Sequence, residues 1–162
     1  MRHILRRHEI VTDDWLHLGE VPQGTPPEAV IVPLAELRKD PTTWQAFSGR
    51  LGVRVAPADR VEDFAAELPR VTLVAVEFPN PGDGRGYTIG RLLRERYKFA
   101  GELRAVGHVK RDQIFIMARS GFDSLEVVPA DLPAAAEYLK RYSVAYQPGA
   151  PTEAIRQQRF TL

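Results

Sequence analysis

Short apolar runs alternate with amphipathic segments between residues 29 and 128. Runs with so few polar residues are typical of strands that are buried on both faces of a parallel sheet. The pattern therefore predicts an α/β fold with about five parallel strands in βα units. We expect these strands near residues 29–33, 51–56, 72–78, 103–107 and 124–128.

Two arrangements of these units stay open, because right-handed crossovers produce either an open doubly wound sheet or a curved, partial (β/α) barrel. Before them, residues 3–18 alternate loosely and predict a short N-terminal strand pair, with a loop rich in proline and glycine up to residue 28. We expect one domain over residues 1–162, ending in a loosely packed tail over 147–162. That tail could reach over a neighbouring subunit in a homodimer.

Composition removes several classes of function. The chain has no cysteine, which excludes disulfides, thiolate metal ligands and cysteine nucleophiles. A formal net charge of +1 gives no global attraction to nucleic acid or to a membrane surface. No apolar run approaches the roughly 20 residues that span a bilayer, so we expect a cytoplasmic protein. The histidines lack metal-ligand spacing and no common nucleotide fingerprint is present, so we expect no metal site and leave the cofactor unknown.

The loop after the central strand has an unusual composition, Asp83, Gly84, Arg85, Gly86 and Tyr87. Its two glycines let the backbone turn tightly and approach a ligand, and Arg85 can pair bidentately with a phosphate, carboxylate or sulfur oxyanion. In parallel α/β sheets, ligands bind at this carboxyl end of the strands. One interpretation is therefore an anion site. The other is a tight turn in which Asp83 and Arg85 make structural hydrogen bonds to the turn or to an adjacent loop.

The next strand is followed by a second polar loop, which contains Arg111, Asp112 and Gln113. Basic residues at the start of a helix are disfavoured by the helix dipole, so Arg111 needs an additional reason to be there. A bound anion would supply one, and so would a carboxylate such as Glu77. The alternative is that Arg111 is solvated or paired within the protein.

Between the two loops, the sequence predicts a helix with Thr88 as its N-terminal cap. Its apolar face is formed by Ile89, Leu92, Leu93 and Tyr97. On this pattern Arg91, Arg94 and Glu95 should face solvent.

Several short motifs in this region resemble those of a bacterial family of uncharacterised proteins, the domain-of-unknown-function 934 family. The motifs are F-x-x-x-x-D-G-R-G-Y from Phe78, R-L-L-R from Arg91, G-E-L-R-A-V-G from Gly101, R-D-Q from Arg111 and R-S-G-F-D from Arg119. Members are commonly encoded beside sulfite reductase genes, so the resemblance implies a role in sulfite reduction or sulfate assimilation. No catalytic residues are established for the family, and none is assigned here.

Our leading hypothesis from the sequence is an oxidoreductase or accessory factor of sulfite reduction that binds an anion at the strand carboxyl ends. In it, Arg85 and Arg111 contact the anion while Asp83 and Asp112 orient them. The alternative is a non-catalytic adaptor that binds sulfite reductase or its electron donor. Whether the chain catalyses a reaction is not evident from the sequence.

Overall fold

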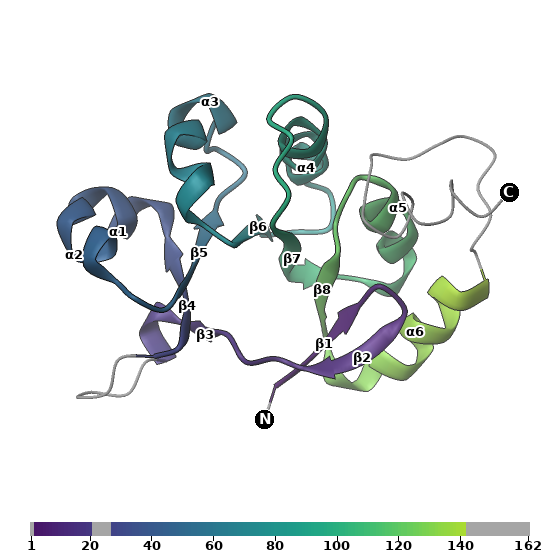
Figure 1. Ribbon diagram of the computed structural model, residues 1–162. Helices are drawn as coiled ribbons and strands as arrows, with labels where there is room; N and C mark the ends of the chain where they lie inside the picture. Colours follow the sequence, from purple (N-terminus) through teal and green to yellow (C-terminus); the bar gives the residue numbers. More distant parts are fainter. Residues whose placement is uncertain (1, 21–26, 142–162) are drawn as a thin grey trace, which may run out of the picture.

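A single curled sheet organises the protein, and the computed structural model describes it over residues 2–20 and 27–141. Its eight strands lie in the order β2-β1-β8-β7-β6-β5-β4-β3. The six strands from β3 to β8 are parallel, and β1 pairs antiparallel with both β2 and β8. The sheet curves into a half-barrel with the helices on its convex side (Figure 1).

The elements follow one another along the described chain as predicted for repeated βα units. The strands are β1 (His3–Arg6), β2 (Glu9–Thr12), β3 (Leu16–His17), β4 (Ala29–Pro33), β5 (Arg50–Val55), β6 (Leu73–Phe78), β7 (Glu102–Val109) and β8 (Ser124–Val127). The α-helices are α1 (Leu34–Lys39), α2 (Pro41–Ala46), α3 (Val61–Phe64), α4 (Arg85–Glu95), α5 (Ile114–Arg119) and α6 (Leu132–Arg141). Short 3-10 helices occur at Leu18–Glu20, Ala65–Arg70, Arg111–Gln113 and Pro129–Asp131.

The predicted α/β class and the N-terminal strand pair are confirmed. Of the two arrangements that the sequence allowed, the curved sheet matches the partial barrel. One strand was not predicted. The two residues of β3 pair in parallel with Val30 and Ile31 of β4, and two residues are too few to produce a periodic signal. The tail over residues 147–162 lies outside the described residues.

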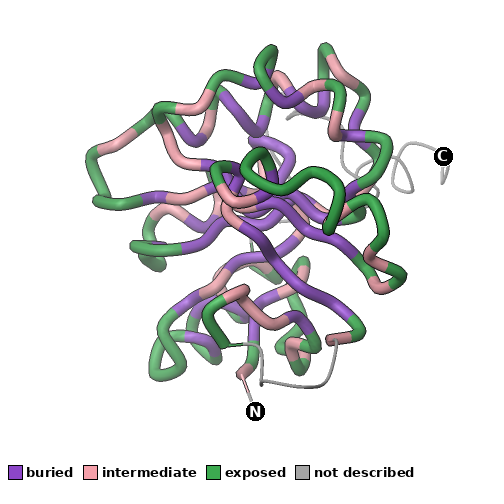
Figure 2. The backbone as a smooth tube through the Cα atoms, turned by 90° about the vertical axis from the view of Figure 1, so that its left-hand side faces the viewer, coloured by how far each residue is buried: buried purple, intermediate pink, exposed green. Residues whose placement is uncertain are grey.

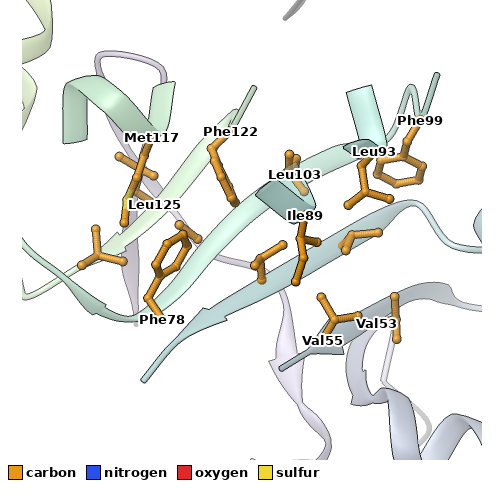
Figure 3. Close-up of a cluster of buried hydrophobic side chains, with 14 of the residues drawn as sticks. Val53, Val55, Phe78, Ile89, Leu93, Phe99, Leu103, Met117, Phe122 and Leu125 are labelled. Carbon is orange, nitrogen blue, oxygen red and sulfur yellow. The ribbon is translucent and has the colours of Figure 1, made fainter. Parts of the chain in front are cut away.

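Side chains alternate between the two faces of the sheet and form two apolar clusters. On the convex side, the helices cover an outer cluster that includes Val53, Val55, Phe78, Ile89, Leu93, Phe99, Leu103, Met117, Phe122 and Leu125 (Figure 3). The concave side carries an inner cluster of Trp15, Ala29, Ile31, Leu73, Ala75 and Val106. Buried residues accordingly follow the strands through the middle of the molecule, while exposed residues concentrate in the peripheral turns and helices (Figure 2).

The segment between β2 and β3 runs across the concave side of the sheet (Figure 1). Its Asp13 carboxylate is fully buried and accepts hydrogen bonds from Arg2 and Arg104, both at 2.9 Å. Arg104, a fully buried residue of β7, also donates to Glu102 (2.8 Å) and Ser124 (3.3 Å). An unpaired buried charge would be strongly unfavourable, so these bonds hold the crossing segment against the middle of the sheet.

We expect Arg104→Met to lower the free energy of unfolding by about 3–5 kcal/mol, because it leaves the buried Asp13 carboxylate without its partner on β7. Urea denaturation followed by circular dichroism measures this loss. As a control, Arg96→Met removes a largely exposed arginine and should change stability by less than about 0.5 kcal/mol. A loss below about 1 kcal/mol for Arg104→Met would show that the buried ion pairs do not hold the segment in place.

Candidate functional site

The two loops that the sequence singled out meet at the carboxyl edge of the sheet. The loop after β6 contains Asp83 and Gly84, and the loop after β7 contains Arg111, Asp112 and Gln113. Gln113 joins them, because its Nε2 donates a hydrogen bond to the carbonyl oxygen of Pro81 (2.8 Å). The Gln113 Oε1 atom is buried and accepts no hydrogen bond within the described chain.

Helix α4 begins earlier than the sequence pattern predicts. Gly84 occupies the N-cap position, and Arg85, Gly86 and Tyr87 form the first turn of the helix instead of the end of the loop. The predicted cap, Thr88, is therefore wrong. Asp83 takes over part of that role, since its Oδ1 accepts a hydrogen bond from the Arg85 backbone N–H (3.1 Å) and satisfies one free donor of the first turn.

Asp83 and Arg85 also bond to each other through their side chains. Arg85 Nε donates to Asp83 Oδ1 (2.9 Å), and Arg85 Nη2 donates to Asp83 Oδ2 (2.7 Å). The hydrogen bond and the positive charge of Arg85 lower the pKa of the Asp83 carboxyl. The same hydrogen bond and the negative charge of Asp83 raise the pKa of the Arg85 guanidinium. The Arg85 side chain is 63% exposed and that of Asp83 only 8%, so the guanidinium is open to solvent while the carboxylate is mostly covered.

The two buried glycines of α4 serve helix packing. A Cβ atom on Gly86 would lie 2.6 Å from the Phe78 ring, and one on Gly90 would lie 2.7 Å from the Phe122 ring. The two positions are one helical turn apart, so together they let α4 lie directly on these two aromatic rings. Gly84 is different, because a Cβ atom there would meet no atom within 4 Å.

Strand β7 has a constrained backbone shortly before its end, where the second loop follows. Gly107 has φ +93°, and a Cβ atom there would lie 2.6 Å from the Phe78 carbonyl oxygen, so only glycine fits without strain. Lys110, Arg111 and Asp112 follow as exposed residues, and none of them forms an ion pair with another described residue. Burial and, secondarily, the charge of Asp112 raise the pKa of the half-buried Tyr87.

The prediction that Arg94 faces solvent is wrong, because this side chain is 7% exposed. Its guanidinium donates to the carbonyl oxygens of Phe99 (2.6 Å), Gly101 (2.9 Å) and Gly121 (3.0 Å), and it pairs with the Asp123 carboxylate. Helical periodicity missed this position because it marks apolar faces, and Arg94 reaches three carbonyls that lie beyond its own helix. The motifs around Arg94 and Asp123 therefore contain a structural ion pair.

Two charged residues of the concave face were not assigned to the site from the sequence. Arg54 of β5 and Glu77 of β6 are both half-buried, and neither side chain forms a hydrogen bond or ion pair with another described residue. From the sequence, Glu77 is only one carboxylate that could balance Arg111. The sequence did contain a signal for Arg54, because this charged residue stands between Val53 and Val55, two apolar residues that are fully buried in the same strand.

A hollow of about 510 Å³ lies at the opposite, amino edge of the sheet. Its lining residues are Pro27, Glu28, Ser48, Gly49, Arg50, Leu51, Arg70 and Thr72. Both arginines there are already engaged, Arg50 with Asp14 and Arg70 with Glu67. The cations of the hollow are thus neutralised by carboxylates of the chain, unlike Arg54 and Arg111 at the carboxyl edge.

The packing of α4 predicts opposite results for two glycine-to-alanine substitutions. Gly90→Ala should lower the free energy of unfolding by about 1–2 kcal/mol, because the clash with Phe122 outweighs the gain of about 1 kcal/mol in helix propensity. Gly84→Ala is the matched control, and it should stay within about 0.5 kcal/mol of the natural protein. Urea denaturation compares them. Equal stability of the two variants would contradict the assigned packing.

The Asp83–Arg85 pair predicts a titration shift. In Arg85→Gln, the pKa of Asp83 should rise toward its ordinary value of 3.8, because the main lowering interaction is gone. Because the Asp83 pKa is lower in the folded protein, the pair stabilises the fold at pH values above the ordinary pKa of Asp83. This contribution is lost as the pH falls through the lowered pKa. NMR titration of the Asp83 carboxyl carbon measures the shift, with Arg91→Gln as control. An unchanged Asp83 pKa in Arg85→Gln would contradict the pair.

Among residues 2–20 and 27–141, no group of three or more potential metal ligands comes together, and no helix is both long and apolar enough to cross a membrane. A comparison with curated proteins finds no match to this chain. Residues 52–155, more than half of the chain, match the sequence profile described as a bacterial protein of unknown function, DUF934. The match begins within β5 and extends beyond α6, so it includes the Asp83–Arg85 and Arg94–Asp123 pairs. The protein therefore belongs to the bacterial DUF934 family, whose function is unknown.

Proposed function

We propose that the protein acts in sulfite reduction, as an oxidoreductase or as an accessory factor, and binds an anion at the carboxyl ends of β6 and β7. The observation that carries the site is the joining of the two loops by Gln113, beside the exposed and unpaired Lys110 and Arg111. The assignment to sulfite reduction rests on the resemblance of the motifs to a family commonly encoded beside sulfite reductase genes.

Charge supports an anionic ligand at this edge. The described part of the chain provides no carboxylate partner for Lys110 or Arg111, although Glu77 and Asp112 lie on the same edge of the sheet. Basic groups at the start of a helical turn are unfavourable unless an anion balances them. Sulfite is a small oxyanion with three acceptor oxygens, which suits a guanidinium that can donate two parallel hydrogen bonds.

Arg85 can join such a site by changing partners. The Arg85 side chain is 63% exposed although that of Asp83 is only 8% exposed, so a ligand oxyanion can approach the guanidinium from solvent and replace part of the bond to the carboxylate. Asp83 would then hold the guanidinium in place through one oxygen while the ligand takes the other side. In this arrangement Arg85 and Arg111 contact the anion, and Asp83 and Asp112 orient them.

The same basic residues also favour the second candidate, an adaptor that binds sulfite reductase or its electron donor. An exposed basic cluster without internal partners suits an acidic protein surface as well as a small anion, and such contacts weaken as the salt concentration rises. Co-purification with the reductase separates the two. A complex that forms at low salt and is lost in Arg111→Gln supports the adaptor, whereas no complex at low salt argues against it.

Deletion of the gene tests the role in sulfite reduction. We expect the deletion strain to fail with sulfate or sulfite as its sulfur source and to recover with sulfide. The natural chain and Arg91→Gln should restore growth. The double variant Arg85→Gln/Arg111→Gln should not, because each lost charge-assisted bond costs about 1.5–3 kcal/mol, or at least about tenfold in affinity.

Two results would contradict the proposal. Normal growth of the deletion strain on all three sulfur sources would show that the protein is not required for sulfite reduction. Full growth with the double variant, at the natural protein level, would leave the role in sulfite reduction standing. It would show that Arg85 and Arg111 are not needed for that role.

A further inference from the structure

Strand β5 presents two arginines to the concave side of the sheet, Arg50 and Arg54, one on either side of Gly52. Val53 and Val55 point the other way and are fully buried in the outer cluster. Gly52 lies under the Trp15 ring, where a Cβ atom would come within 3.1 Å of it. Trp15 thus covers the middle of β5 and separates the two guanidinium groups.

The two arginines differ in their partners. Arg50 pairs with Asp14, and its guanidinium lies 5.1 Å from the centre of the Trp15 ring. The other arginines of the concave side are also matched to acids: Arg2 to Asp13, Arg6 to Glu102, and Arg104 to both of these acids. Arg54 alone among them has no acid within ion-pair distance in the described chain, although it is half-buried.

Uncharged residues flank Arg54 in the sheet. Its register partners on the neighbouring strands are Pro33 and Ala75, two side chains that carry no charge and do not reach far from the sheet. Glu77 lies two residues beyond Ala75 on the same face, opposite Val106 in the strand register. Its carboxylate likewise has no hydrogen-bond or ion-pair partner among the described residues. Ala75 and Val106 belong to the inner cluster, so Arg54 and Glu77 stand at the carboxyl edge of an apolar floor.

We infer that Arg54 and Glu77 form the inner part of the anion site, where they bind a small oxyanion that also carries a proton. The guanidinium of Arg54 donates two hydrogen bonds to oxygens of the anion, and the carboxylate of Glu77 accepts a hydrogen bond from its protonated group. Hydrogen sulfite and hydrogen phosphate share this chemistry. The choice of sulfite as the natural ligand rests on the proposed function, whereas the pair itself does not depend on it.

A guanidinium and a carboxylate select such a ligand better than basic residues alone. Arg54 would bind any oxyanion, but Glu77 repels a fully deprotonated one and accepts a bond only from a form that retains a proton. The apolar floor beneath removes water from one side of the ligand and strengthens both interactions. The exposed Lys110 and Arg111 would then form the outer rim of the same site.

Calorimetric titration of the purified full chain with sodium sulfite, and separately with sodium phosphate, tests the assignment. We expect Arg54→Gln to weaken binding of both anions at least tenfold. Glu77→Gln should remove the repulsion of fully deprotonated sulfite, so that sulfite binding persists at high pH, where the natural protein releases this ligand. The matched control is Arg50→Gln, which removes the same charge from the same strand face beyond Trp15 and should leave affinity within twofold.

The folded state of each variant is checked by urea denaturation. Arg54→Gln should be as stable as the natural protein or more so, since Arg54 has no partner to lose, while Arg50→Gln loses its contacts with Asp14 and Trp15. A destabilised Arg54→Gln variant would mean that Arg54 serves the fold, and would overturn the assignment.

The outcomes separate this inference from the proposed function. If Arg54→Gln stays folded and binds sulfite normally, the inner site is wrong, and growth of the deletion strain still decides the role in sulfite reduction. If the natural chain binds neither anion, the inner site is again wrong, and co-purification then tests the adaptor. If binding of both anions depends on Arg54 but the deletion strain grows normally, the inner site is supported and the proposed role in sulfite reduction is wrong.

Discussion

The fold depends on how the Arg104 guanidinium is buried at the centre of the concave face. A half-barrel leaves the inner side of its strands open, and here a segment of the same chain fills that side. Asp13 and Glu102 neutralise Arg104, and Trp15 packs on the apolar residues beside them. Burial of a single charge would be strongly unfavourable, so the segment and the sheet are stable only together. Edge strand β3 is reached through this segment, and its His17 bonds Glu126 of β8 across the sheet (3.1 Å).

This closure also shapes the electrostatics of the inner face. Burial acts to raise the pKa of Glu126, but the hydrogen bond and charge of His17, together with Arg2 and Arg104, outweigh it and lower the pKa. Negative charge is thereby held in the middle of the concave side, and every arginine near it has a partner. Toward the carboxyl edge this matching stops at Arg54. Because the other charges of the concave side are paired, an unpaired charge at one end of it is a candidate for contact with a ligand.

Periodicity predicted the class of fold from the sequence, but not its curvature. The apolar runs of β4 to β8 indicate strands covered on both faces, and the cover on the inner face comes mostly from Trp15 and its neighbours. A pattern of buried strands is the same whether helices or a crossing segment cover the second face, so the open sheet and the partial barrel could not be separated. The crossing segment itself carries polar residues whose partners, such as Arg104, lie about ninety positions away.

The position proposed for the site follows from the fold class, since ligands of parallel α/β sheets bind at the strand carboxyl ends, but the choice of residues does not. Arg94 and Arg111 look alike in the sequence, because each is an arginine within a family-like motif near the end of a strand or helix. The structure separates them through their hydrogen bonds. Arg94 is bound by three carbonyls and Asp123, so its place is explained by the fold, while Arg111 has no such bonds.

Hydrogen bonding thus divides the motif residues more sharply than resemblance does. Gly86 and Gly90 are explained by the aromatic rings beneath α4, and Gly107 by the close approach of the Phe78 carbonyl. Arg85 stands between the two groups, because Asp83 holds it in a bond that is open to solvent. An arginine already paired with an acid is a poor primary anchor for an anion, since binding must first replace that acid. Half-buried Arg54 needs no such exchange, so in the proposed site it would make a stronger contact than Arg85 of the loop.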